Sequence, residues 1–549
     1  MSQVSNLRII PMGGVGEIGK NMTLVEYDNQ ILIIDAGLMF PENDMLGVDI
    51  LIPDMSYILQ HRDRVCSIIV THGHEDHTGA LPYLLPHLDQ VPIYATRLTR
   101  GLVEVKLKEH KINGVDFRTI SAGDRLDIGP FEVEFFHVSH SIPDGVGLAI
   151  RTPAGLIVHS GDFKLDHSPV DGHRTDFARL ADFGREGVLL LMSDSTNAET
   201  PGYTPSEQEI ASTLEQAFVE AQGRVIVATF ASNISRVQQV VDIAARHDRF
   251  VSVIGRSMVN NVRMAQELGY LHVPNGVMVG SEEINYLPSR KIALVCTGSQ
   301  GEPTSALVRM ASGDSRSVSL KLGDTVIISA TPIPGNEELV NRTVNNLFRR
   351  GATVYYDEIF DVHVSGHASQ EEQKMMLNLI RPRYFVPIHG EYRHLVLHAK
   401  LAEQVGIPKE RIFVLDSGDI LELNCLSAAI VDRVAQDRVF VDGLGVGDVD
   451  DAVLHDRRLL SRNGYIVAVV VLDRYTGRTL TPPRIVSRGL AYNQEAEELL
   501  RGLEEQTAKV AGEGGNAAAI TTRIKASLAS YVYDRIGRRP IIQPMVIEV

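Results

Sequence analysis

The segment formed by residues 71–77, Thr-His-Gly-His-Glu-Asp-His, constrains the fold more than any other part of this 549-residue chain. It carries three imidazoles and two carboxylates, and it directly follows the apolar run 67–70. Such a run is typical of a buried β-strand, and a short loop at the strand end can direct several side chains to one position. Imidazole nitrogens and carboxylate oxygens suit zinc or manganese. The segment therefore predicts a metal site at a strand end.

Three further candidate ligands follow other strand-like runs. His140 comes after residues 131–138, Asp162 after 156–161 and His389 after 384–388. Singly, each residue is more often structural, but with the first cluster they complete a set of seven. Seven ligands are too many for one tetrahedral ion and suit two ions that share a carboxylate, a common centre for phosphoester hydrolysis. The predicted metal ligands are His72, His74, Asp76, His77, His140, Asp162 and His389.

The spacing of these ligands predicts an inserted domain. Asp162 and His389 lie 227 residues apart. Between them, a helical pattern over 206–222 is followed by strand-like runs that alternate with helical patterns up to residue 329, which indicates a parallel sheet. If both residues bind the same metals, the first domain is split around the second. From about residue 455, a third unit has a strand-like run, two helical segments and a terminal strand.

Composition bounds the class of protein. The chain is too long for one hydrophobic core, and it has no apolar run of about 18 residues that would span a membrane. Its N-terminus lacks the basic segment and apolar core of a signal peptide. The three cysteines are scattered and odd in number, which fits a reducing compartment. We therefore expect a cytoplasmic protein without a membrane segment.

The motifs, taken in order, resemble those of a known family. Beside the cluster at 71–77, the matching segments are residues 13–21, 34–37, 139–144, 161–164, 193–196, 229–233, 255–258, 296–303, 365–367 and 387–391. The cluster alone marks the metallo-β-lactamase superfamily, and the later segments resemble the ribonuclease J family of its β-CASP group. The resemblance spans most of the chain and shows no departure at a metal position. His389 favours RNA, because the DNA-processing branch usually lacks this histidine.

The resemblance implies an α/β fold: a metallo-β-lactamase αββα sandwich with an inserted β-CASP α/β domain and a small α+β C-terminal domain. The expected boundaries are 1–200 and 351–450 for the two parts of the metallo-β-lactamase domain, 201–350 for the β-CASP domain, and 451–549 for the linker and C-terminal domain.

The resemblance also implies a metal-dependent ribonuclease with 5′→3′ exonuclease and endonuclease activity, which prefers 5′-monophosphate ends and acts in messenger RNA decay and ribosomal RNA maturation. The implied partners are single-stranded RNA, further copies in a homodimer or homotetramer, and other proteins of an RNA-degrading complex. A net charge of −16 is unusual for RNA binding, so we expect a local channel rather than a basic surface.

The resemblance implies a role for each site residue. His72, His74 and His140 would bind one Zn²⁺ or Mn²⁺ ion, Asp76, His77 and His389 the other, and Asp162 would bridge them. Asp76, His367 and Asp194 are the expected catalytic residues. Ala231, Ser232 and Asn233 and the opposing His363, Val364, Ser365, Gly366 and His367 would hold RNA phosphates. The carbonyls of Leu46 and Val48 with the Asp442 carboxylate would bind a structural Ca²⁺.

Other interpretations stay open. For residues 231–233, the pattern alone favours a plain helix N-cap over an anion site. Residues 14–19 match the G-x-G-x-x-G of dinucleotide-binding folds, but the following β-rich segment favours a glycine turn beside the metals. Asp35 is expected to orient a ligand by a hydrogen bond. The alternative functions are a lactamase-fold hydrolase of a thioester or lactam, a redox di-iron protein, and a non-catalytic RNA-binding subunit.

Overall fold

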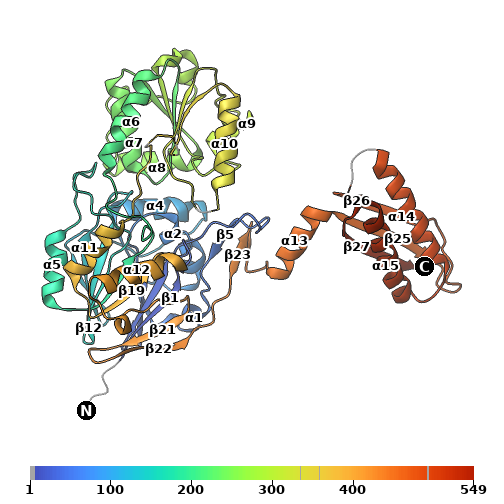
Figure 1. Cartoon of the computed structure of the whole chain (residues 1–549), viewed down its shortest axis with the longest axis horizontal. Helices are drawn as coiled ribbons and strands as arrows, with labels where there is room; N and C mark the ends of the chain where they lie inside the picture. The colour runs from blue at the N-terminus through green and yellow to red at the C-terminus, as the bar shows by residue number, and fades with distance from the viewer. Residues whose placement is uncertain (1–5, 334, 358, 361, 491–493) are drawn as a thin grey trace. The chain divides into compact units, whose positions relative to one another are not determined.

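The computed structural model describes residues 6–549 apart from 334, 358, 361 and 491–493. These residues form two compact units (Figure 1). The first contains Met1–Pro41 and Ile50–Val439, and the second contains Glu42–Asp49 and Phe440–Val549. Within the described part of the chain, no helix combines the length and apolar character needed to cross a membrane.

Two β-sheets form the base of the first unit. Their strand orders are β22-β21-β1-β3-β4-β6-β7-β8 and β19-β13-β12-β11-β10-β9. The strands of the first are β1 (Leu7–Gly13), β3 (Met22–Tyr27), β4 (Gln30–Ile34), β6 (Val65–Ile69), β7 (Ile93–Thr96), β8 (Phe117–Ile120), β21 (Asp419–Leu423) and β22 (Ala428–Arg433). Those of the second are β9 (Arg125–Ile128), β10 (Phe131–His137), β11 (Val146–Thr152), β12 (Gly155–His159), β13 (Val188–Asp194) and β19 (Tyr384–Ile388).

The two sheets pack face to face, because alternate apolar residues of each enter one core. Ile9 and Val25 from the first sheet lie in the same buried cluster as Phe135 and Leu190 from the second. The other face of the second sheet is covered by α5 (Phe177–Glu186), α11 (Gln370–Ile380) and α12 (Tyr392–Gln404). The remaining α-helices of this base are α1 (Ser56–Gln60), α2 (Glu75–Thr78), α3 (Leu81–Leu84) and α4 (Arg97–Glu109).

A five-stranded sheet is formed by the residues between β13 and β19, and it is green to yellow in Figure 1. Its order is β15-β16-β14-β17-β18, and every neighbouring pair is parallel, as predicted. Its strands are β14 (Val225–Ala228), β15 (Phe250–Ile254), β16 (Ile292–Cys296), β17 (Thr325–Ile328) and β18 (Thr353–Tyr355). One face packs on α6 (Glu207–Glu220), α7 (Ile234–Arg246) and α8 (Arg256–Glu267), the other on α9 (Ala306–Ser312) and α10 (Glu337–Arg349).

The insertion leaves and rejoins the second sheet at two adjacent strands. β13 and β19 are parallel neighbours, and Asp194 at the end of β13 is in register with Ile388. The segments that follow both strands therefore lie at one sheet edge, although the whole inserted domain separates them in the sequence. This pairing brings Asp194 and His389 together.

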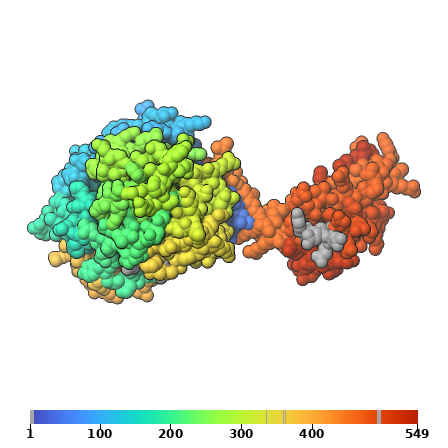
Figure 2. Space-filling model, turned by 90° about the horizontal axis from the view of Figure 1, so that it is seen from above, coloured from blue at the N-terminus to red at the C-terminus, as the bar shows by residue number. Residues whose placement is uncertain are grey.

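The part of the second unit that begins at Phe440 is orange to red in Figures 1 and 2, whereas its short segment Glu42–Asp49 is blue. Its central strand β25 (Tyr465–Leu472) pairs antiparallel with β26 (Arg484–Arg488) and parallel with β27 (Ile541–Glu548). Every second residue of β25 is buried, under α14 (Gln494–Gly512) and α15 (Ala517–Ile536). The unit also contains α13 (Asp451–Asn463) and β24 (Gly445–Val446), which pairs with β23 (Val439–Asp442).

Candidate metal centre

The predicted loop follows a strand, as the sequence indicated. β6 ends at Ile69, the residues 70–74 form the loop, and α2 begins at Glu75. His72 and His74 thus lie in the loop, and His77 lies in the short helix. The backbone N–H and hydroxyl of Thr71 both donate to the Asp35 carboxylate, at 2.8 and 2.9 Å, which fixes the start of the loop against the end of β4.

Three imidazoles converge at one point. Nδ1 of His74 lies 3.1 Å from Nε2 of His72 and 3.1 Å from Nε2 of His140. Burial lowers the pKa of His74 to about 4, and burial together with neighbouring imidazolium charge lowers the pKa of His72 and His140 well below the usual value. The three rings are therefore neutral at pH 7 and present lone pairs to a common position, which suits one cation.

Two carboxylates and two imidazoles form a second group beside the first. Asp76 Oδ2 lies 3.2 Å from Nε2 of His389, and Asp162 Oδ2 lies 3.2 Å from Nε2 of His77 and 3.4 Å from that of His389. Burial opposes ionisation of Asp76 and Asp162, yet the neighbouring histidines lower the pKa of both carboxyls. The buried Asp162 carboxylate and the half-buried Asp76 carboxylate need positive charge close by, so this donor set also fits a divalent ion.

Asp162 lies between the two groups. Its Oδ2 is 3.6 Å from Nε2 of His72 and 3.8 Å from Nε2 of His140, in addition to its contacts with His77 and His389. One carboxylate oxygen thus faces four ring nitrogens drawn from both groups. The structure brings the seven predicted ligands together in two neighbouring sets, and Asp162 Oδ2 faces ring nitrogens of both.

The outward nitrogens of four histidines are held by partners. Nδ1 of His77 contacts Asp35 at 2.8 Å, and Nδ1 of His140 contacts the Gly366 carbonyl at 2.7 Å. The corresponding partners of His72 and His389 are the hydroxyls of Thr71 at 3.1 Å and Thr196 at 2.6 Å. Since both hydroxyls donate onward to aspartates and each partner accepts from Nδ1–H, every Nε2 faces the centre. Burial lowers the pKa of His77 and His389, but the charges of Asp162 and Asp76 outweigh it and raise the pKa of His77 well above its usual value and that of His389 to about 9. A metal would therefore displace a proton from Nε2 of these two rings.

We expect that Asp35→Asn weakens metal binding about 10- to 100-fold, the range found when a carboxylate behind a ligating histidine is lost. The Asp35 carboxylate accepts from Thr71 and His77 at once, whereas an amide presents one oxygen and would turn its NH₂ group towards one of these donors. Competition with a chelating dye measures the affinity. Asp28→Asn, at an exposed turn, is the matched control. Equal metal affinity in the two variants would contradict this role.

A pair formed by the half-buried His367 and the buried Asp194 adjoins the candidate ligands. Nδ1 of His367 lies 2.7 Å from Oδ2 of Asp194, and the ring centroids of His367 and His140 are 4.9 Å apart. Burial lowers the pKa of His367, but the Asp194 charge outweighs it and the pKa is raised. Gly366 permits this close packing, because a Cβ there would lie 2.6 Å from Cε1 of His140.

The two predicted phosphate-binding segments, 231–233 and 363–367, both border the core of the inserted domain. Asn233 is the N-cap of α7, where its side chain accepts from the Arg236 N–H at 2.9 Å, while Ala231 and Ser232 are half-buried. Val364 and Ile234 belong to the same buried cluster. Burial and the nearby charge of Arg236 lower the pKa of His363, which places this histidine close to α7. The nearby His363 contacts Thr331 Oγ1 at 2.8 Å, and Ser365 accepts from Asn197 at 2.8 Å.

Two of the three predicted calcium ligands, Leu46 and Asp442, contact the same cationic side chain, that of Arg457. The Leu46 carbonyl accepts from Arg457 Nη1 at 3.0 Å, and the Asp442 carboxylate accepts from Nη2 of the same residue. Val48 lies two residues after Leu46 and is buried. Its backbone N–H donates to the Met45 carbonyl. The oxygens of Leu46 and Asp442 therefore converge, but a Ca²⁺ ion would compete with the guanidinium for them.

Comparison with known proteins agrees with this geometry. Models of four domains match the chain: the metallo-beta-lactamase superfamily at 15–199, the ribonuclease J beta-CASP domain at 222–347, the Zn-dependent metallo-hydrolase RNA specificity domain at 352–414 and the ribonuclease J C-terminal domain at 452–549. Ribonuclease J2 of Bacillus subtilis is 41% identical over 99% of both chains. Ribonuclease J of Thermus thermophilus is 43% identical over 99% of this chain and 95% of its own.

The chain belongs to the ribonuclease J family. Its predicted fold class, a metallo-β-lactamase domain with an inserted β-CASP domain and a C-terminal domain, is confirmed, and so is its class of enzyme, a ribonuclease that uses divalent metal. A crystal structure of a protein of unknown function from Enterococcus faecalis shares the fold, with a TM-score of 0.55 and 17% identity over 76% of this chain and all of that chain. Family membership speaks against the redox protein and the small-substrate hydrolase.

Several residues that position the centre lie in the matched segments, but the sequence predicted no role of their own for them. Thr71, Thr196 and Asn21 contact ligands directly, the last through its amide 3.1 Å from Nε2 of His77. The glycine turn also contributes, because the Gly14 carbonyl accepts from the backbone N–H of His389 at 2.8 Å. Threonine and asparagine are common in loops, so only the fold shows which of them face the ligands.

Proposed function

We propose that this metal-dependent ribonuclease hydrolyses single-stranded RNA from its 5′ end, releasing mononucleotides, and also cleaves internally. One observation carries the proposal. The His/Asp cluster continues through half-buried His367 and buried Asp194 into the segment 363–367, whose Val364 shares a buried core with Ile234 at the start of α7. A reacting phosphate at the metals and a second phosphate at the helix N-terminus would thus lie on one continuous surface of polar groups.

Two Zn²⁺ or Mn²⁺ ions bound by the seven ligands would supply a nucleophilic hydroxide near pH 7 and offset phosphoryl charge. The protein's own groups orient the reaction. His77 and His389 are held by Asp35 and Thr196, so their rings cannot turn away from the centre. His367 donates its Nδ1–H to Asp194. Its Nε2 is then left to contact the scissile phosphate or the leaving 3′-oxygen. The products would carry a 5′-phosphate and a 3′-hydroxyl.

The N-terminus of α7 offers the site for the 5′-terminal phosphate. Backbone N–H groups at a helix start attract anions, and α7 has thirteen residues over which its dipole accumulates. Ser232 and His363 from the two segments would add side-chain donors. We propose that this site selects 5′-monophosphate ends and sets the exonuclease register.

We expect RNA with a 5′-monophosphate to be degraded at least about tenfold faster than the same RNA with a 5′-triphosphate or 5′-hydroxyl, because one well-formed set of charge-assisted hydrogen bonds changes binding by 1.4 kcal/mol or more. The measurement follows mononucleotide release with added Mn²⁺ and with chelator. Metal-dependent cleavage that ignores the 5′ end would refute the phosphate site. RNA binding without cleavage under any metal would point to a non-catalytic subunit.

The other roles implied by the resemblance are also proposals. They are the activity in messenger RNA decay and ribosomal RNA maturation in the cytoplasm, assembly into a homodimer or homotetramer, and association with an RNA-degrading complex. We also propose the domain boundaries near residues 200, 350 and 450. A structural Ca²⁺ at Leu46, Val48 and Asp442 is proposed with the condition that it displaces Arg457 from the two oxygens that this side chain contacts.

A further inference from the structure

A network of four buried charged side chains lies beside the metal centre. Lys164 and Asp166 follow Asp162 in the loop after β12, Glu207 is the first residue of α6, and Arg236 is the third residue of α7. Their side chains are at most 8% exposed. Lys164 and Asp166 come from the metallo-β-lactamase part of the chain, whereas Glu207 and Arg236 come from the inserted domain. The network therefore joins the two domains across their boundary.

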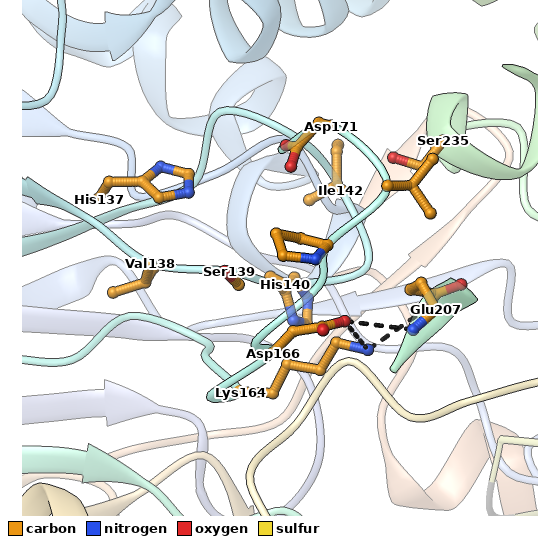
Figure 3. A pocket seen from close by; sticks show the side chains of 12 residues that line it. His137, Val138, Ser139, His140, Ile142, Lys164, Asp166, Asp171, Glu207 and Ser235 are labelled. Atoms are coloured by element: carbon orange, nitrogen blue, oxygen red, sulfur yellow. Dashed lines mark hydrogen bonds and ion pairs between the residues drawn. The ribbon is translucent and has the colours of Figure 1, made fainter. Parts of the chain in front are cut away.

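The contacts run in sequence from one domain to the other. Arg236 Nη2 donates to Glu207 Oε2 at 2.8 Å, and Lys164 Nζ lies 3.8 Å from Glu207 Oε1. Asp166 lies 3.5 Å from Lys164 Nζ and accepts from the Glu207 backbone N–H at 3.1 Å. Dashed lines in Figure 3 mark the contacts among Lys164, Asp166 and Glu207. Two cations and two anions balance, so no net charge is buried.

Stability alone does not account for this arrangement. Replacing a buried ion pair with apolar residues is often neutral or stabilising, because the charges lose their hydration. Here the pairing is also incomplete. Among the residues that the structure describes, none forms a hydrogen bond with Nε or Nη1 of Arg236 or with Oε1 of Glu207. Buried polar atoms without a hydrogen bond cost stability. We therefore attribute to the network a role in holding α6 and α7 in a fixed position relative to the loop after β12.

Both ends of the network are tied to site residues by very short stretches of chain. Lys164 is two residues after Asp162, and its backbone N–H donates to the Ser139 carbonyl, next to His140. Arg236 is three residues after Asn233, whose side chain accepts its backbone N–H. Between these ends lies a pocket lined by His140, Lys164, Glu207 and Ser235, as Figure 3 shows.

We propose that Lys164, Glu207 and Arg236 are positioning residues that fix the N-terminus of α7 relative to the metals and thereby set how many nucleotides separate the held 5′-phosphate from the bond that is cut. This inference rests on the proposed exonuclease function. An internal cut uses the metals without the phosphate site. The network should therefore govern end-dependent cleavage and leave internal cleavage unaffected.

Glu207→Gln tests this directly, because it removes the charge and keeps the shape. We expect the preference for 5′-monophosphate RNA over 5′-hydroxyl RNA to fall about tenfold or more, since a displacement of about 1 Å at a reacting group costs up to about 100-fold. Dinucleotides should appear among the products. Cleavage of a circular RNA, which has no 5′ end, should stay unchanged. Arg236→Met should behave alike, and Arg236→Lys, which keeps the charge, should retain mononucleotide products.

Arg224→Met is the matched control. Arg224 forms another buried pair, with Asp324 at 3.0 Å from Nε, and it precedes β14, at the strand end opposite α7. This variant should lose thermal stability but keep the 5′ preference and product length. The inference is overturned if Glu207→Gln keeps both properties, or if it lowers linear and circular RNA cleavage equally. Wild-type enzyme without any 5′ preference would instead refute the proposed function.

Discussion

Asp162→Asn should lower the kcat/KM of RNA cleavage by at least about 10³-fold, because stabilisation by a catalytic metal pair is worth several kcal/mol. One oxygen of Asp162 faces ring nitrogens of His72, His77, His140 and His389 within 3.8 Å. An asparagine keeps the volume but removes the negative charge that both groups of ligands share. Bound metal, measured by elemental analysis, should fall from two ions to at most one per chain.

The matched control for this variant is Asp127→Asn. Asp127 lies on β9 of the same domain and is exposed, so its loss changes net charge equally without touching the centre. Thermal unfolding checks that Asp162→Asn still folds. A variant that binds two ions and cleaves RNA at the wild-type rate would show that Asp162 is not the bridging ligand.

The residues that form this His/Asp cluster could be recognised in the sequence as candidate ligands because most of them follow apolar runs. His389 comes directly after β19, and His72 lies three residues past β6. A strand in a buried sheet reads as an apolar run, and polar residues at its end stand out. The strands β14 to β17 and the helices α6 to α8 of the inserted domain were predictable for the same reason, whereas α9, α10 and the short edge strand β18 were not predicted.

The order of the strands and the residues behind the ligands could not be predicted in this way. β13 and β19 are neighbours, yet no local pattern in either segment indicates a partner so distant in the sequence. Thr196 contacts Asp194 two residues before it in the chain, but it contacts His389 only because this pairing brings the two strand ends together. The Glu207–Arg236 pair is similarly hidden, since a helix-start glutamate and a helical arginine usually face solvent. Tertiary contacts decide these roles, and residue type alone does not.

Asp194→Asn should lower the cleavage rate about 10²- to 10⁴-fold, the range of general acid–base catalysis, while two metal ions stay bound. Asp194 accepts from Nδ1 of His367 at 2.7 Å and from the Thr196 hydroxyl at 2.8 Å. Its charge raises the pKa of His367 despite burial. An amide would remove this charge and would offer an NH₂ group to Nδ1, which favours the tautomer with the proton on the wrong nitrogen.

The combination of Asp194→Asn with His367→Ala separates this role from a structural one. If Asp194 acts through His367, the double variant should cleave RNA no more slowly than His367→Ala alone, because residues that act as a unit are not additive. Single-turnover cleavage at saturating enzyme isolates the chemical step, and elemental analysis follows the metals. Losses that multiply, or a metal content that falls with Asp194→Asn, would mean that Asp194 acts mainly through Thr196 and His389, because that second path leads directly to a ligand.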